Sequence, residues 1–176
     1  MRDNHIRDIM FLDLICKAEP AYAPCHSMAY FVENVERLFA TNQTAKWNRN
    51  QTQKLYIRDL EIQDNQYALM LLYFNNGNAS AASYCHLDTN HQRVEPPQDR
   101  EGRPESAHLL INLSPANMSQ VRHLALLEDS PRINRRVLQA YFNFLFREIK
   151  KLQDVDFQAD HPDGSRDVAG QPHKYK

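Results

Sequence analysis

Residues 67–74, Tyr-Ala-Leu-Met-Leu-Leu-Tyr-Phe, form the longest apolar run of the chain. A strand that is apolar along its whole length is covered on both faces, so this run predicts a central strand of a sheet. Asn75-Asn76-Gly77-Asn78 follows directly. An Asn-Gly pair between apolar runs indicates a hairpin, because both central residues of such a turn need positive φ. We therefore expect a hairpin with Asn76-Gly77 at its tip, which pairs 67–74 with a return strand at 79–88.

Residues 54–62 indicate a neighbouring strand with an irregularity. Leu55 and Ile57 are out of phase by one position with Leu60 and Ile62. A β-bulge near Arg58-Asp59 would bring both pairs onto the same face.

Three other segments bear on the sheet. The apolar run 9–16 is interpreted as a strand, and 107–113 alternates between apolar and polar residues as a half-buried strand does. Residues 120–127 fit a strand and a helix equally well.

Two segments predict helices. Residues 28–39 carry apolar side chains at spacings of three and four, and Ser27 is suited to cap the N-terminus. A second helix is expected from about 131 to 152, because Pro131 suits a first helical turn and the apolar stripe continues from there.

Two polar segments predict loops. Residues 41–53 are rich in Asn and Gln. Residues 92–105 contain Pro96, Pro97 and Pro104, which interrupt helices and sheet ladders alike, so we expect no regular structure there.

The order of these elements predicts an α+β fold, with an antiparallel sheet of about five strands and two main helices packed on it. A chain of 176 residues is long enough for one core. We expect a single α+β domain over 1–153. The polar segment 154–176 is interpreted as a tail or a linker.

Composition limits the classes of function. The formal net charge of −1 gives no global attraction to nucleic acid or to a membrane, so any such binding must use a local patch. Three cysteines, Cys16, Cys25 and Cys85, are too few and of the wrong parity for a disulfide framework. No apolar run is long enough to span a bilayer. These features predict a cytoplasmic protein without a membrane partner.

The residues most similar to an enzyme site lie at 85–91, Cys-His-Leu-Asp-Thr-Asn-His, together with His108. Such residues can bind a transition metal or transfer protons. Their spacing matches no standard zinc pattern, and no nucleophile or phosphate-binding motif is present. We therefore assign no catalytic residue, metal or cofactor. A small metal-dependent enzyme, such as a nuclease, remains an alternative centred on this cluster.

Basic residues favour a different function. The only tryptophan lies in a polar, basic segment, and the last helix has a strong excess of Arg and Lys. Basic grooves with aromatic side chains are how single strands of nucleic acid are bound. The residues expected to bind nucleic acid are Lys46, Trp47, Arg49, Arg135, Arg136 and Lys150.

The last helix is also wider in its apolar stripe than one core face requires. Phe142, Phe144 and Phe146 cannot all face one sheet, since neighbours in this set lie about 200° apart on a helix. We expect part of this surface to be buried in a homo-oligomer or against a second domain. The first hypothesis is thus a non-enzymatic module that binds nucleic acid and self-associates. A protein-binding adaptor, or the N-terminal part of a longer protein, is a further alternative.

Overall fold

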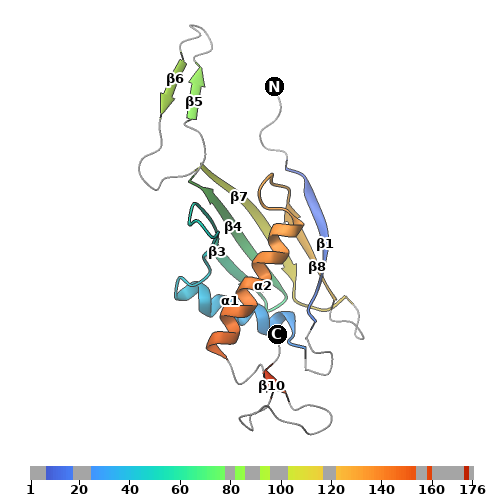
Figure 1. Cartoon of the computed structure of the whole chain (residues 1–176). Helices are drawn as coiled ribbons and strands as arrows, with labels where there is room; N and C mark the ends of the chain where they lie inside the picture. Colours follow the sequence, from blue (N-terminus) through green and yellow to red (C-terminus); the bar gives the residue numbers. More distant parts are fainter. Residues whose placement is uncertain are drawn as a thin grey trace.

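The computed structural model describes residues 7–17, 25–77, 82–85, 92–95, 103–116, 122–153, 158–159 and 173–174. Most of them belong to one six-stranded antiparallel sheet and two helices (Figure 1). In sheet order the strands are β1 (Ile9–Ile15), β8 (Arg122–Glu128), β7 (Arg103–Asn112), β4 (Tyr67–Asn76), β3 (Gln53–Gln63) and β2 (Lys46–Trp47). The helices are α1 (Met28–Ala40) and α2 (Arg135–Leu152). The expected α+β class is confirmed, with six strands in place of about five.

Two short ladders lie outside this sheet. β5 (Ala82–Cys85) pairs with β6 (Gln92–Glu95), and β9 (Gln158–Ala159) pairs with β10 (His173–Lys174).

β4 is central, as its apolar sequence predicts, but its partners differ from the expected hairpin. It pairs with β3 on one side and β7 on the other, so the predicted pairing of 67–74 with 79–88 is wrong. Asn76 belongs to the strand itself, opposite Gln53 and Arg103. The turn into β4 is instead made by Asp64 and Asn65, whose φ angles are 51° and 53°. Asp and Asn tolerate this left-handed region almost as Gly does, so turn chemistry alone did not identify the tip of the hairpin.

The prediction of no regular structure over 92–105 is also wrong in part, because β6 and the start of β7 fall within it. Pro104 lies opposite Asn75 in β4. The register between β7 and β8 covers Leu109 to Ile111, well beyond Pro104. A proline is tolerated where a strand is bonded on one side only, and Pro104 occupies such a position. Pro96 and Pro97 lie outside the described residues.

Most of the other local predictions are confirmed. The register of β3 slips between Ile57 and Asp59, which confirms the bulge. The segment around 120–127 is a strand, β8. α1 confirms the first helix, and the Ser27 hydroxyl accepts a hydrogen bond from the Tyr30 backbone N–H at 3.1 Å. The segment expected to be a loop, 41–53, contains the two-residue strand β2.

α2 begins later than the sequence suggested. Asn134 is its cap, with a side-chain carbonyl that accepts hydrogen bonds from the backbone N–H groups of Arg136 and Val137, both at 3.1 Å. Ile133 just before it is completely buried. Residues 131–133 therefore form a turn that anchors the helix to the core, rather than its first helical turn.

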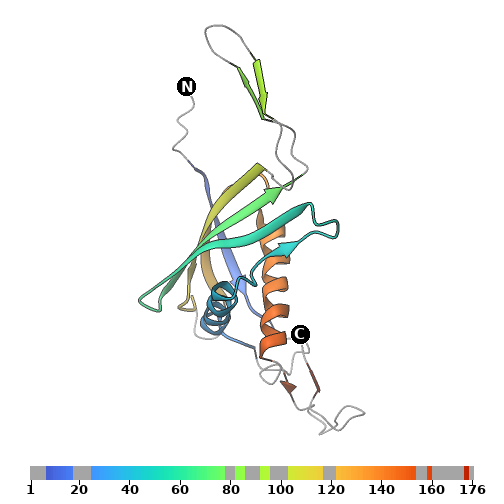
Figure 2. The same ribbon diagram turned by 90° about the vertical axis from the view of Figure 1, so that its left-hand side faces the viewer.

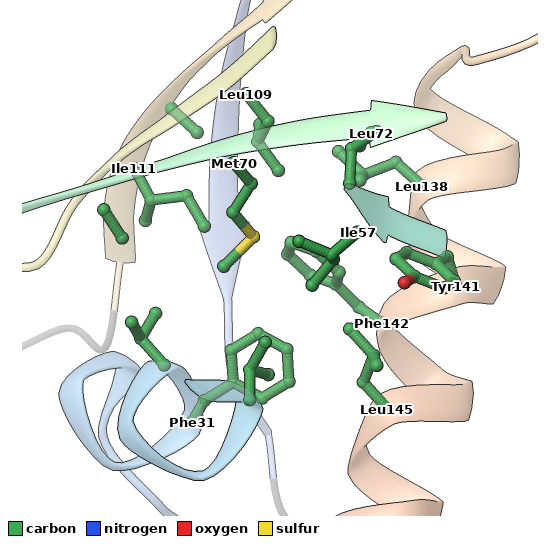
Figure 3. Packing of buried hydrophobic residues seen from close by; sticks show 14 of the residues in the cluster. Phe31, Ile57, Met70, Leu72, Leu109, Ile111, Leu138, Tyr141, Phe142 and Leu145 are labelled. Atoms are coloured by element: carbon green, nitrogen blue, oxygen red, sulfur yellow. The ribbon is translucent and has the colours of Figure 1, made fainter. Parts of the chain in front are cut away.

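Both helices cover the same face of the sheet, which curves around them (Figure 2). Side chains from alternate strand positions meet the helices there, and Phe31, Met70 and Phe142 lie in the space between the layers (Figure 3). Each such fully buried apolar side chain contributes about 1.5–3 kcal/mol relative to an exposed one. None of the helices in the described ranges is long and apolar enough to cross a membrane.

The opposite face of the sheet, called the open face below, is the face turned away from α1 and α2. Strand alternation places Trp47, Lys54, Tyr56 and Tyr73 on it near the β2 edge, since their strand neighbours Leu55, Ile57 and Leu72 are buried against the helices. Toward the β1 edge the same face is apolar. There Phe11, Leu126, Leu110 and Leu69 form one row across four strands.

Candidate nucleic-acid interface

β2 places Lys46 and Trp47 at the edge of the sheet. Lys46 lies opposite Leu55 and Trp47 opposite Lys54. Because neighbouring residues of a strand point to opposite faces, Lys46 turns toward α2 and Trp47 toward the open face. The Trp47 side chain is 48% exposed, so its ring remains accessible for contact with a ligand.

The turn after β2 is held by the side chain of Asn48. Its carbonyl oxygen accepts hydrogen bonds from the backbone N–H groups of Thr52 at 2.9 Å and Gln53 at 3.1 Å. Its amide donates to the Thr52 hydroxyl at 3.0 Å. Gln51 adopts a positive φ of 55° within this turn. These bonds fix the turn that carries the exposed Arg49 beside Trp47.

Lys54 connects two rings on the open face. Its ammonium lies 5.2 Å from the centroid of the Trp47 ring and 4.4 Å from that of Tyr56. The Tyr56 ring lies in turn 5.9 Å from that of Tyr73 on β4. We call Trp47, Lys54, Tyr56 and Tyr73 the aromatic row. Cation–π attraction of this kind contributes about 0.5–1 kcal/mol at exposed sites.

Lys46 has a structural partner. Its ammonium donates to the carbonyl oxygen of Ala140 at 2.8 Å, so it connects β2 to α2. Burial lowers the pKa of Lys46, and the nearby charge of Arg147 lowers it further. On the same side, the hydroxyl of the buried Tyr141 donates to the Thr44 carbonyl at 2.7 Å, and burial raises its pKa. Lys46 therefore positions the edge strand and the helix beside each other.

α2 lies on the face of the sheet opposite the aromatic row, with its first turn beside the β2 edge. A shallow pocket at the sheet edge is lined by Trp47, Phe74 and Val137, so the first turn of α2 lies beside β2. Arg135 and Arg136 are exposed in that turn. Lys150 lies near the other end of the helix, about 22 Å from Arg135 along the axis at 1.5 Å per residue. The six predicted residues do not gather into one cluster.

Arg135 and Arg136 occupy an electrostatically unfavourable position. Positive charge at a helix N-terminus opposes the helix dipole and costs about 0.3–1 kcal/mol per residue. Among the described residues, neither guanidinium forms an ion pair, and the first turn of α2 contains no acidic residue. Two unneutralised arginines at this place are suited to receive an external anion.

The three phenylalanines of α2 all have contacts within the chain. Phe142 is buried, with its ring centroid 5.1 Å from that of Phe31. Phe146 stacks on Phe31 at 4.4 Å, and Phe144 stacks on Tyr141 at 6.1 Å. Phe144 and Phe146 are half-buried on the two flanks of the helix. The broad apolar stripe of α2 thus contacts α1 on one side and the β2 side of the core on the other. Self-association through this helix stays a prediction.

The residues considered for metal binding divide between described and undescribed parts of the chain. Cys85 ends β5, while 86–91 lies outside the described residues. His108 is exposed on the open face, where its Nδ1 lies 2.9 Å from a carboxylate oxygen of Glu128. The described residues contain no group of three or more side chains arranged to hold a metal ion.

Glu128 is the centre of a structural ion cluster. Its carboxylate accepts the His108 backbone N–H at 2.9 Å and lies 3.3 Å from the Arg7 guanidinium. Burial acts to raise the pKa of Glu128, but the hydrogen bonds from His108 and the charge of Arg7 outweigh it and lower that pKa. The cluster connects the start of β1 to β7 and β8.

Sequence reasoning did not assign Lys54, Tyr56 or Tyr73 to the site. Lys54 and Tyr56 alternate with buried residues of one strand. That alternation in the sequence could have placed both side chains on the face of the sheet away from the core. Tyr73 comes from β4 and is brought next to Tyr56 only by strand pairing.

Neither a protein-family model, nor a curated protein, nor a solved structure matches this chain. The fold and the site define a two-layer α+β domain whose sheet has an aromatic and basic edge.

Proposed function

We propose that the protein binds single-stranded nucleic acid on the open face of the sheet, at the edge formed by β2, β3 and β4. The observation that carries this proposal is the half-exposed indole of Trp47, which shares the Lys54 ammonium with Tyr56. Aromatic rings on the face of an antiparallel sheet stack on unpaired bases, and nearby cations bind the phosphates.

The charge distribution supports a local mode of binding. The chain as a whole is nearly neutral, so attraction must come from local cations. These are Arg49 and Lys54 at the aromatic row, and Arg135 and Arg136 in the first turn of α2, on the helix side of the same sheet edge. Duplex DNA hides the faces of its bases within the stack, whereas single strands present them. Stacking on Trp47 and Tyr56 therefore favours single strands.

The sole tryptophan makes the direct experiment simple. Trp47 is the only source of indole fluorescence, so a base stacked on it changes the emission of the wild-type protein. We expect short oligothymidine strands to quench this emission at low salt and the quenching to weaken as salt increases. A blunt duplex of the same length is the control. An emission spectrum unaffected by any single strand at low ionic strength contradicts the proposal.

A second candidate function, a protein-binding module, is favoured by the other end of the open face. Ile9, Phe11 and Ile15 of β1 and Leu124 of β8 are large apolar side chains with more than a third of their surface exposed. Apolar surface of this kind on a folded domain marks contact sites for proteins.

A further inference from the structure

β1 forms one edge of the main sheet, and its outer side has no strand beside it among the residues that the structure describes. The backbone N–H of Asp129 donates to the carbonyl of Asp8 at 2.7 Å. In an antiparallel pair the hydrogen-bonded positions alternate, so the even-numbered residues of β1 direct their backbone groups toward β8. The backbone N–H and C=O groups of Ile9, Phe11, Asp13 and Ile15 therefore point outward from the edge.

The side chains of this edge do little to prevent strand pairing. Proteins usually protect exposed edges with charges, prolines or bulges. From Ile9 to Ile15 there is one charged residue, Asp13, and no proline. Phe11 is 75% exposed and Ile9 is 56% exposed. An unprotected, apolar edge of this length is suited to receive another strand.

We propose that a second copy of this chain occupies the edge, by antiparallel pairing of β1 with β1 about a two-fold axis at Met10. In this register Ile9 faces Phe11 of the second copy, and Arg7 faces Asp13 of the second copy. The symmetry makes each of these contacts twice. Ile9, Phe11 and Asp13 carry outward backbone groups, and the alternation continues to Arg7, so each facing pair exchanges two backbone hydrogen bonds.

Charge complementarity selects this register over its neighbours. A register centred on Ile9 sets Phe11 opposite Arg7, and one centred on Phe11 sets Ile9 opposite Asp13. A register centred on Leu12 sets Arg7 opposite Lys17, which repels it. Only the register centred on Met10 sets Arg7 opposite Asp13 and also sets Ile9 opposite Phe11.

The contacts of Arg7 and Asp13 within one chain are compatible with this pairing. Arg7 lies 3.3 Å from Glu128, and Asp13 lies 3.9 Å from Arg122. A guanidinium has five donors, so Arg7 can bind Glu128 and a second carboxylate at once. The side chains of both Arg7 and Asp13 are 57% exposed, which leaves them accessible to a second copy.

The register is tested by disulfide formation in the full chain with Cys16, Cys25 and Cys85 replaced by Ala. At the two-fold axis the Met10 positions form a non-hydrogen-bonded pair with Cα atoms about 4.5 Å apart, within disulfide range. Met10→Cys should therefore form a disulfide-linked dimer under mild oxidation. Leu12→Cys is the matched control, because its two copies lie roughly 13 Å apart along the strands and should not be linked.

The charge pairing is tested separately by sedimentation equilibrium. Asp13→Arg and Arg7→Asp should each weaken dimerisation by about tenfold, since each sets like charges opposite each other twice. The double variant should restore the wild-type affinity, while thermal melting of each variant reports its folding. A wild-type monomer at all concentrations overturns the proposal. So does a link through Leu12→Cys without one through Met10→Cys, or a dimer unaffected by the single charge reversals. Neither experiment involves nucleic acid, so its result is independent of the function proposed above.

Discussion

The proposed binding of nucleic acid depends most on the indole of Trp47. Stacking of one base on an aromatic ring contributes about 1–3 kcal/mol, so Trp47→Ala should weaken single-strand binding by about tenfold. Trp47→Phe should retain part of the affinity. Tyr67→Ala is the matched control, since Tyr67 is exposed at the far end of β4, about 20 Å from Tyr73, the member of the aromatic row on the same strand, at 3.4 Å per residue. Equal losses in Trp47→Ala and Tyr67→Ala by fluorescence anisotropy would contradict a role for the aromatic row.

The hydroxyl of Tyr141 illustrates how a single polar atom positions the edge of the sheet. It is the hydrogen-bond donor to the Thr44 carbonyl, and Thr44 is itself buried just before β2. Tyr141→Phe leaves that carbonyl without its partner, at an expected cost of about 1–2 kcal/mol in the free energy of unfolding. Urea denaturation measures the change. A variant as stable as wild type would contradict a structural role for this hydrogen bond.

At the scale of the element, α2 is defined by its cap. Asn134→Ala removes the acceptor for two backbone N–H groups and should lower the free energy of unfolding by about 1 kcal/mol. Asn143→Ala is the matched control in the same helix, because Asn143 is exposed in the helix interior and alanine has the higher helix propensity. We expect that control to be neutral or slightly stabilising. If both variants lose the same stability, the cap contributes nothing specific.

The first turn of α2 also has a part in the proposed interface. Arg135→Ala combined with Arg136→Ala should reduce the slope of log affinity against log salt by about 1.4, since each phosphate contact on a single strand contributes about 0.7. Lys150→Ala, near the other end of the helix, should leave the slope unchanged. Binding titrations over a range of salt concentrations measure both. A larger effect from Lys150 would place the strand along the whole helix instead.

At the scale of the whole molecule, the Glu128 cluster connects the first strand to the middle of the sheet and makes stability depend on pH. The pKa of Glu128 is lowered in the folded chain from its ordinary value of 4.5. Its stabilising contribution is therefore present above pH 4.5 and is lost as the pH falls through the lower, folded value. Glu128→Gln should be less stable than wild type at neutral pH, and the difference should close in acid.

Thermal melting of the two proteins from neutral to acid pH measures this difference. Glu36→Gln on the exposed side of α1 accounts for the general effect of removing one negative charge. A difference that stays constant across the acid range would contradict the role of the ionised Glu128 carboxylate.

The sequence predicted those features of the fold that depend on the residues of a single helix or strand. The bulge between Ile57 and Asp59 follows from the phase of four apolar side chains. The central position of β4 agrees with its apolar sequence, although α1 and α2 cover only one of its faces. Ser27 and the stripe of α1 define the first helix. The exposed Trp47 and its basic neighbours could also be selected from sequence, as residues with no place in an apolar pattern.

Pairing between distant segments was decided by the tertiary structure, because backbone hydrogen bonds carry no signature of the partner strand. Asn76 ends β4 and Gly77 follows it without forming the predicted hairpin, while β7 came to lie beside β4 from beyond the β5–β6 ladder. The same pairing brought Tyr73 to Tyr56. The amino-acid sequence alone therefore determined the class of fold and the type of residue available for binding. Which of those residues share a surface depends on strand order and helix packing, which only the folded chain defines.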